Sequence, residues 1–119
     1  LRIPILGICY GMQLMSHILP GGEVEAAENR EYGRATLEIK KELDLFSGLD
    51  SELECWMSHG DRVVEPPTGF EVLGITENSP LAAIGSDFLQ FYGLQFHPES
   101  ILTDQGKEML NNFLNLRRE

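Results

Sequence analysis

Three side chains of this 119-residue sequence, Cys9, His97 and Glu99, are of the types that perform acyl transfer through a cysteine nucleophile. Cys9 follows the apolar run Ile3-Pro4-Ile5-Leu6 and has a glycine two positions before it and another two positions after it. Glu99 stands two residues after the histidine. A thiol attacks a carbonyl carbon, an imidazole transfers the proton, and a carboxylate orients the imidazole. These residue types predict nucleophilic catalysis if folding brings the two segments together.

The segment around Cys9 predicts a strand that turns sharply into a helix. Apolar residues up to Leu6 are typical of a strand, and Met12, Leu14 and Met15 follow at helical spacing. Flanking glycines allow the strained turn that exposes a nucleophile at the carboxyl edge of a sheet. Unpaired amides at the start of the helix stabilise a thiolate, so we expect them to lower the cysteine pKa by about one unit or more. The competing interpretation is a cysteine that only packs in the core.

The second segment predicts a strand that ends at the histidine. Residues 92–97 alternate as in a strand, and Pro98 ends the pairing, which leaves His97 at a strand terminus. Glu99 is close enough in sequence to turn back to the imidazole and fix its tautomer. The alternative interpretation is a histidine beside a solvated glutamate.

The motifs Gly-Ile-Cys-Tyr-Gly-Met-Gln at 7–13 and Gln-Phe-His-Pro-Glu-Ser at 95–100 together resemble the nucleophile and histidine–glutamate motifs of class I (triad) glutamine amidotransferases. The resemblance implies that the cysteine attacks the side-chain amide of L-glutamine, that His97 shuttles the proton and that Glu99 orients it. It also implies that the backbone N–H of Tyr10 supplies half of the oxyanion hole. The residues that correspond to positions holding the ends of glutamine in relatives are Gln13, Ser58, Gly60 and Asp61.

Segments 31–33, 45–49, 56–61 and 67–70 most resemble the branch of this family that serves GMP synthesis. In that branch, ammonia passes to an ATP-pyrophosphatase synthetase domain or subunit, which converts XMP to GMP. ATP and Mg are expected on that partner, because this sequence has no glycine-rich phosphate loop, and neither a cofactor nor a metal site is expected here. We expect 58–61 and 31–33 to contact the partner.

Two alternatives stay open. Segment 100–103 resembles the amidotransferase of anthranilate synthase, which would give the ammonia a different acceptor. The chain could also be a non-catalytic fragment that retains the fold and the motifs alone.

The resemblance implies an α/β fold, with an open, mostly parallel, flavodoxin-like sheet flanked by helices and an added antiparallel section. Residues 1–119 are expected to form a single domain. Family members carry strands and a glycine-rich loop, with the second oxyanion donor, before the nucleophile strand. The N-terminal part of the family domain is therefore expected to be missing.

Periodicity predicts further strands over 35–39, 53–57, 70–76 and 81–84. It also predicts a helical turn over 43–49 and a turn at 58–61. Cys55 is expected in the core. A closing helix capped by Thr103 or Asp104 should pack on the sheet through Met109, Leu110, Phe113, Leu114 and Leu116.

The sequence has 19 acidic and 9 basic residues and a net charge of −10. This charge argues against nucleic-acid and anionic-membrane partners, because both would be repelled. No apolar stretch approaches the roughly twenty residues needed to span a bilayer. Two cysteines do not suggest a disulfide framework, and a nucleophilic thiol needs a reducing compartment, so the cytoplasm is the expected location.

Overall fold

The computed structural model describes residues 3–42 and 44–116, without the side chains of 27–31, 44 and 59. Within these residues, six strands form one sheet in the order β1-β6-β5-β4-β2-β3. The elements in chain order are β1 (Ile5–Ile8), α1 (Tyr10–Ile18), β2 (Glu23–Ile39), the 3-10 helix η1 (Asp44–Phe46), β3 (Glu52–Glu65), β4 (Glu71–Ile75), β5 (Ala83–Ser86), β6 (Phe91–Leu94) and α2 (Gly106–Leu114).

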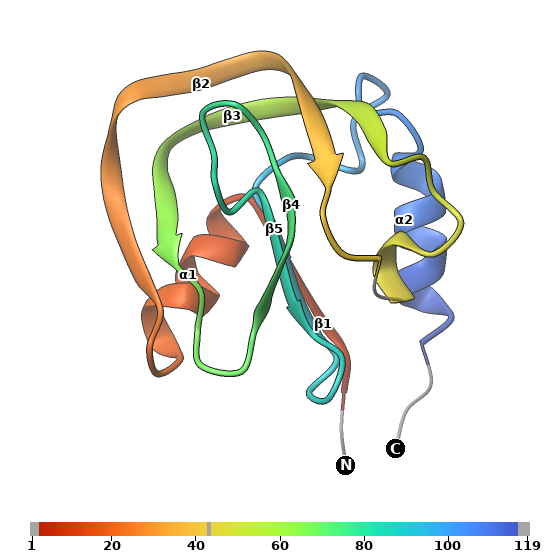
Figure 1. Cartoon of the computed structure of the whole chain (residues 1–119), viewed down its shortest axis with the longest axis horizontal. Coiled ribbons are helices and arrows are strands. Elements are labelled where there is room, and N and C mark those ends of the chain that lie inside the picture. The colour runs from red at the N-terminus through yellow and green to blue at the C-terminus, as the bar shows by residue number, and fades with distance from the viewer. Residues whose placement is uncertain (1–2, 43, 117–119) are drawn as a thin grey trace.

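The long β2 and β3 strands form a ribbon that arches over the shorter strands, and α1 and α2 lie on opposite sides of those strands (Figure 1). Two buried apolar clusters match this arrangement. Met109 of α2 belongs to one cluster, with Tyr92 among its members, whereas Met12 of α1 belongs to the other, with Ile84. Because neighbouring residues of a strand point to opposite faces, the central strands contribute to both clusters.

The α/β fold with helices on both faces is confirmed, but antiparallel pairing takes up more of the sheet than predicted. Among the described strands, β1 and β6 pair in parallel, and the other four pairings are antiparallel. The reason lies in the connections. Residues 76–82 and 87–90 are too few for the crossover of a dozen or more residues that parallel neighbours require.

The predicted turn at 58–61 is wrong, because these residues belong to β3, although the register with β2 shifts between the Ala26–Asp61 and Glu31–His59 pairs. Ser58 pairs with Tyr32 of β2, and Asp61 pairs with Ala26. Ser-His-Gly-Asp is typical of a turn when considered locally. Here the long β2 strand offers these residues backbone partners, so the ladder with β2 decides their conformation.

The closing helix is present, but its predicted cap is wrong. α2 begins after Gln105, which has a φ of 55°, and its start has no side-chain cap. Met109 is fully buried, whereas Leu114 is 76% exposed and does not pack on the sheet as predicted. Leu110, Phe113 and Leu116 are half-buried.

The strands predicted over 35–39, 53–57, 70–76 and 81–84 are confirmed as parts of β2, β3, β4 and β5, but these strands begin or end at other residues than predicted. The helical turn appears as η1, although its first predicted residue, Leu43, lies outside the described residues. Cys55 is fully buried in the core, as expected. No helix of the described residues is long and apolar enough to cross a membrane.

Candidate active site

Cys9 forms a strained elbow between β1 and α1. Its φ of 54° and ψ of −107° lie in a region that residues other than glycine rarely adopt. Its N–H donates a hydrogen bond of 2.6 Å to the carbonyl oxygen of Leu94, and its own carbonyl oxygen accepts one of 3.2 Å from the N–H of Gln13. The end of β6 and the first turn of α1 therefore hold this backbone, and the predicted elbow is confirmed.

The two glycines that flank the elbow differ in the space that each leaves for a side chain. A Cβ on Gly7 would lie 2.8 Å from the carbonyl carbon of Gly11 and 2.9 Å from the nitrogen of Met12. A Cβ on Gly11 would meet no atom within 4 Å. Close approach of strand and helix therefore requires glycine at position 7 alone.

The sulfur of Cys9 is half-buried, and its hydrogen-bonding partners include Ser58 and Gln95. The thiol donates to the carbonyl oxygen of Ser58 at 3.6 Å, and Nε2 of Gln95 donates to the sulfur at 3.7 Å. Burial raises the pKa of the Cys9 thiol. The backbone N–H of Tyr10 and the amide of Gln95 oppose this rise in pKa, and the charge of Glu99 adds to it.

The expected lowering of the cysteine pKa is therefore wrong for the free protein. The N–H of Tyr10 does act on the sulfur in the predicted direction, as a donor at the start of α1. Loss of hydration disfavours the thiolate more strongly than this donor favours it. The Cys9 thiol is directed at the Ser58 carbonyl, and its raised pKa favours the protonated form.

Two buried glutamine amides connect β3 to the sulfur. Nε2 of Gln13 donates to the backbone oxygen of Asp61 at 3.0 Å and to Oε1 of Gln95 at 3.2 Å. The exposed fractions of the two glutamines are 8% and 1%. Sequence reasoning assigned no role to Gln95, and its only signal there was its place next to Phe96-His97 at the end of a predicted strand.

His97 and Glu99 form the predicted pair, with Nδ1 and Oε2 2.9 Å apart. An ionised carboxylate accepts a hydrogen bond from the Nδ1–H group of the imidazole. This leaves Nε2 to exchange a proton with another group. The backbone of this turn is tied to β3. The N–H of His97 donates to the carbonyl oxygen of Trp56, and the hydroxyl of Thr103 donates to the carbonyl oxygen of His97 at 2.7 Å.

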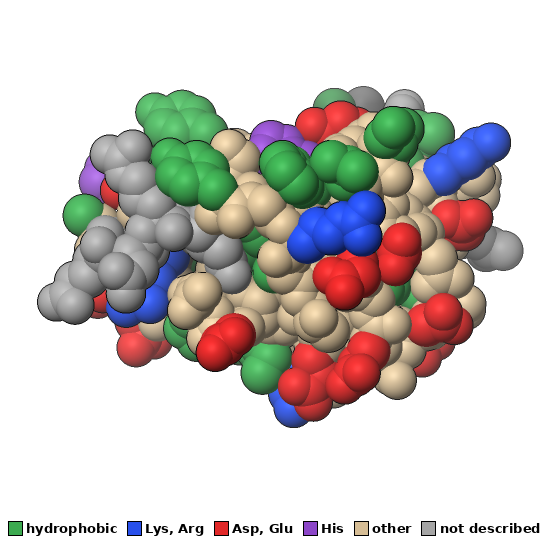
Figure 2. Space-filling view, turned by 90° about the horizontal axis from the view of Figure 1, so that it is seen from above, with side chains coloured by type: hydrophobic (Ala, Val, Ile, Leu, Met, Phe, Trp, Pro, Cys, Tyr) green, Lys and Arg blue, Asp and Glu red, His purple; other side chains and the backbone are tan. Residues whose placement is uncertain are grey.

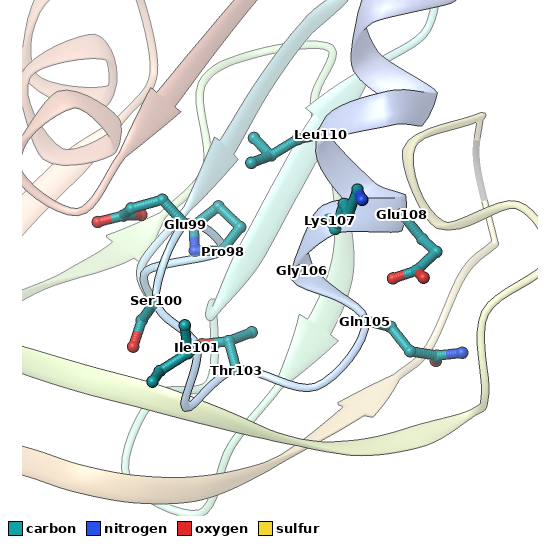
Figure 3. A pocket seen from close by; sticks show the side chains of 10 residues that line it. All are labelled: Pro98, Glu99, Ser100, Ile101, Thr103, Gln105, Gly106, Lys107, Glu108 and Leu110. Atoms are coloured by element: carbon teal, nitrogen blue, oxygen red, sulfur yellow. The ribbon is translucent and has the colours of Figure 1, made fainter.

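The glutamate turns toward the histidine and away from a neighbouring hollow. This hollow of about 370 Å³ lies between residues 98–103 and the first turns of α2. Figure 3 shows the Glu99 side chain pointing away from Lys107 and Glu108 on the far wall. The carboxylate is therefore directed to the imidazole and not into the hollow.

Parallel pairing of β1 and β6 brings the segments of Cys9 and His97 to one edge of the sheet. Ile8 pairs with Leu94, so Cys9 and the residues after β6 emerge at the same end of the strands. Among the described residues, the sulfur's hydrogen-bonding partners are Ser58, Gln95 and the backbone N–H of Tyr10, and the imidazole is not one of them.

The predicted substrate-binding residues lie on both sides of the elbow. Ser58, Gly60 and Asp61 are on β3, and Gln13 reaches them from α1. Of these four residues, Gln13 and Asp61 line a hollow of about 170 Å³, together with Tyr10, Leu14, His17 and Val24. Across residues 3–42 and 44–116, no three His, Cys, Asp or Glu side chains that the structure describes are grouped to hold a metal ion.

Comparison with known proteins places this geometry in context. Residues 1–116 match the family model described as glutamine amidotransferase class-I. The chain is 55% identical over 114 residues to the glutamine-hydrolyzing GMP synthase of Aquifex aeolicus, and 54% identical to that of Halothermothrix orenii. Each alignment covers 96% of this chain and 22% of the relative, so the chain spans about a fifth of the length of these relatives.

Solved structures agree with these sequence relationships. A putative GMP synthase subunit from Thermoplasma acidophilum superposes with a TM-score of 0.89 at 30% identity, over 96% of this chain and 57% of that one. A glutamine amidotransferase from Thermotoga maritima gives a TM-score of 0.74 at 26% identity, over 94% of this chain and 45% of that one.

Proposed function

Because this chain belongs to the class-I glutamine amidotransferase family, we propose that it is the glutaminase unit of a GMP synthase and releases ammonia from L-glutamine. The observation that carries the proposal is the strained cysteine at the same sheet edge as a histidine–glutamate pair. This is the arrangement that thiol acyl transfer needs.

The reaction begins when glutamine displaces the Cys9 thiol from the Ser58 carbonyl. Nε2 of His97 takes the thiol proton while the sulfur forms a bond to the amide carbon, and Glu99 stabilises the imidazolium through Nδ1–H. The backbone N–H of Tyr10 donates to the oxyanion. Collapse of the tetrahedral intermediate breaks the carbon–nitrogen bond, and His97 gives its proton to the departing ammonia.

A thioester on Cys9 remains, and water completes the cycle. His97 takes a proton from this water as its oxygen attacks the thioester carbon. The carbon–sulfur bond then breaks, and the sulfur regains the proton as glutamate leaves. A neutral thiol is consistent with this order of steps. The thiol brings the first proton, and the unprotonated imidazole accepts it.

The hollow beside Tyr10 is the proposed seat for the amino-acid end of glutamine. Both Nε2 hydrogens of Gln13 are donated to protein acceptors, so its Oε1 is oriented to accept from the α-ammonium group. Asp61 forms the β3 side of this hollow, and the α-carboxylate is proposed to bind along β3 at Ser58, Gly60 and Asp61.

The ammonia acceptor is proposed to be a synthetase domain or subunit that binds ATP and Mg and converts XMP to GMP. Support comes from the names and greater length of the relatives. These relatives do not support the alternative suggested by segment 100–103, an acceptor in anthranilate synthesis. The need for a reduced thiol favours the cytoplasm, and both cysteines of the described residues are free.

The proposed contact surface for the synthetase consists of the segments 31–33 and 58–61. Tyr32 and Ser58 are direct partners in the β2–β3 ladder, so the two predicted contact segments form one surface. Tyr32 is 60% exposed. Figure 2 shows hydrophobic side chains gathered along one rim of the view and acidic side chains mainly toward the opposite rim.

The division of labour is tested with Cys9→Ala in the complete protein. Glutamate release should fall to the detection limit, while GMP formation from XMP, ATP and added ammonium should stay within about twofold, because only the thioester step is removed. Cys55→Ala is the matched control, since Cys55 is buried in the core and should retain glutamine hydrolysis. Equal loss of both activities in Cys9→Ala would contradict the proposal.

A further inference from the structure

Gln95 is a buried polar side chain that the steps above do not use. Its exposed fraction is 1%, and its amide lies between the sulfur of Cys9 and the amide of Gln13. A buried amide needs hydrogen-bonding partners, because unpaired polar groups in the interior are costly. The partners of Gln95 include the proposed nucleophile.

The orientation of the Gln95 amide follows from its neighbours. The backbone oxygen of Asp61 only accepts, so it fixes the NH₂ end of Gln13 toward itself, and this NH₂ also faces Gln95. Gln95 must therefore present its oxygen to Gln13. Its own NH₂ then faces the sulfur, at 3.7 Å. A flipped Gln95 would place two NH₂ groups against each other.

We propose that Gln95 is a positioning residue for the nucleophile, whose amide N–H holds the Cys9 sulfur at the elbow and stabilises its thiolate, with Gln13 fixing the direction of that amide. A donor aimed at a sulfur favours the charged form. The chain of two amides thereby connects the backbone of β3 at Asp61 to the reacting atom.

The inference rests on the proposed role of Cys9 as the nucleophile, but its test needs no glutamine. Iodoacetamide alkylates thiolates, so the rate of Cys9 modification against pH gives the thiol pKa. Gln95→Met keeps the side-chain length and removes the donor. We expect the midpoint of the alkylation rate against pH to rise by about one pH unit in Gln95→Met. Alkylation near pH 7.5 should then be about tenfold slower than in the unchanged protein, whereas the two rates should be equal at high pH.

The matched control is Gln90→Met, at the opposite end of β6, which should leave the midpoint unchanged. Gln13→Met should raise the midpoint by less than Gln95→Met does. In Gln13→Met the Gln95 amide is still present beside the sulfur and only loses the partner that fixes its direction. Because the amides act in series, the double variant should match Gln95→Met alone. Peptide mass shows which cysteine is modified. We expect it to be Cys9, because Cys55 is buried.

A Gln95→Met protein that is folded and titrates with the unchanged midpoint would overturn the inference. Should Gln95→Met fail to fold, Gln95→Glu decides. A carboxylate at this place should raise the midpoint by more than one unit, and an unchanged midpoint would again overturn the inference. If the unchanged protein failed to hydrolyse glutamine, but Gln95→Met still showed the expected rise of the midpoint, the result would count against the proposed function alone.

Discussion

Replacing each of the two glycines beside the nucleophile with alanine should have opposite effects on stability. In Gly7→Ala the new methyl group would lie 2.8–2.9 Å from three backbone atoms of α1, whereas ordinary contacts begin at 3.4 Å. The overlap is about half an ångström, and it is with helix backbone that cannot rotate away. In Gly11→Ala the methyl group meets open space.

The expected magnitudes follow from these contacts. Overpacking a rigid site costs about 3 kcal/mol, and the lower entropy of the unfolded alanine chain returns less than about 1 kcal/mol. The free energy of unfolding should therefore fall by about 2 to 3 kcal/mol in Gly7→Ala. Gly11 lies inside α1, where alanine is favoured over glycine, so Gly11→Ala should raise it by about 0.5 to 1 kcal/mol.

Urea unfolding followed by the fluorescence of Trp56, the single tryptophan of this chain, measures both variants. Gly7→Ala should also slow iodoacetamide modification of Cys9, because α1 must move away from β1 and take the elbow with it. If Gly7→Ala were as stable as the unchanged protein, or if Gly11→Ala were the more damaging substitution, the account of the elbow would be refuted.

Three further predictions concern the surroundings of the site. Thr103→Val removes a hydroxyl that donates to the His97 carbonyl and accepts from the Trp56 N–H, so it should cost about 2 kcal/mol in urea unfolding and lower kcat for glutamine hydrolysis. Met109→Ala should cost about 2 to 4 kcal/mol because this side chain is fully buried, whereas Leu114→Ala should stay within about 0.5 kcal/mol by the same measurement. The alkylation rate of Cys9 in the free protein should rise with pH through a midpoint above the usual thiol value of about 8.5, since burial disfavours the thiolate; a midpoint below that value would contradict the role given to burial.

Local sequence patterns predicted the parts of the site that depend on neighbours along the chain. An apolar run, a glycine and a helical spacing were enough to predict the elbow at Cys9, and a short separation was enough to predict the His97–Glu99 pair. The meeting of these two segments at one sheet edge was expected only through the family resemblance. The parallel register of Ile8 with Leu94 supplies the physical reason.

Features that depend on distant parts of the chain could not be predicted in this way. Ser58, His59 and Asp61 lie in a strand because β2 supplies partners from more than twenty residues away. The sign of the Cys9 pKa shift depends on burial by the folded protein. Gln95 is assigned a role only once its amide is found between the sulfur and Gln13. In each case a tertiary contact outweighs the local preference.

The hydrogen bond from the Cys9 thiol to the Ser58 carbonyl also bears on how readily this cysteine is oxidised. Peroxide attacks thiolates much faster than thiols, and it attacks exposed sulfur faster than shielded sulfur. A cysteine kept protonated and half-buried while no substrate is present is therefore a slow target for conversion to sulfenic acid. Raising the thiolate fraction by mutation would make Cys9 more easily oxidised.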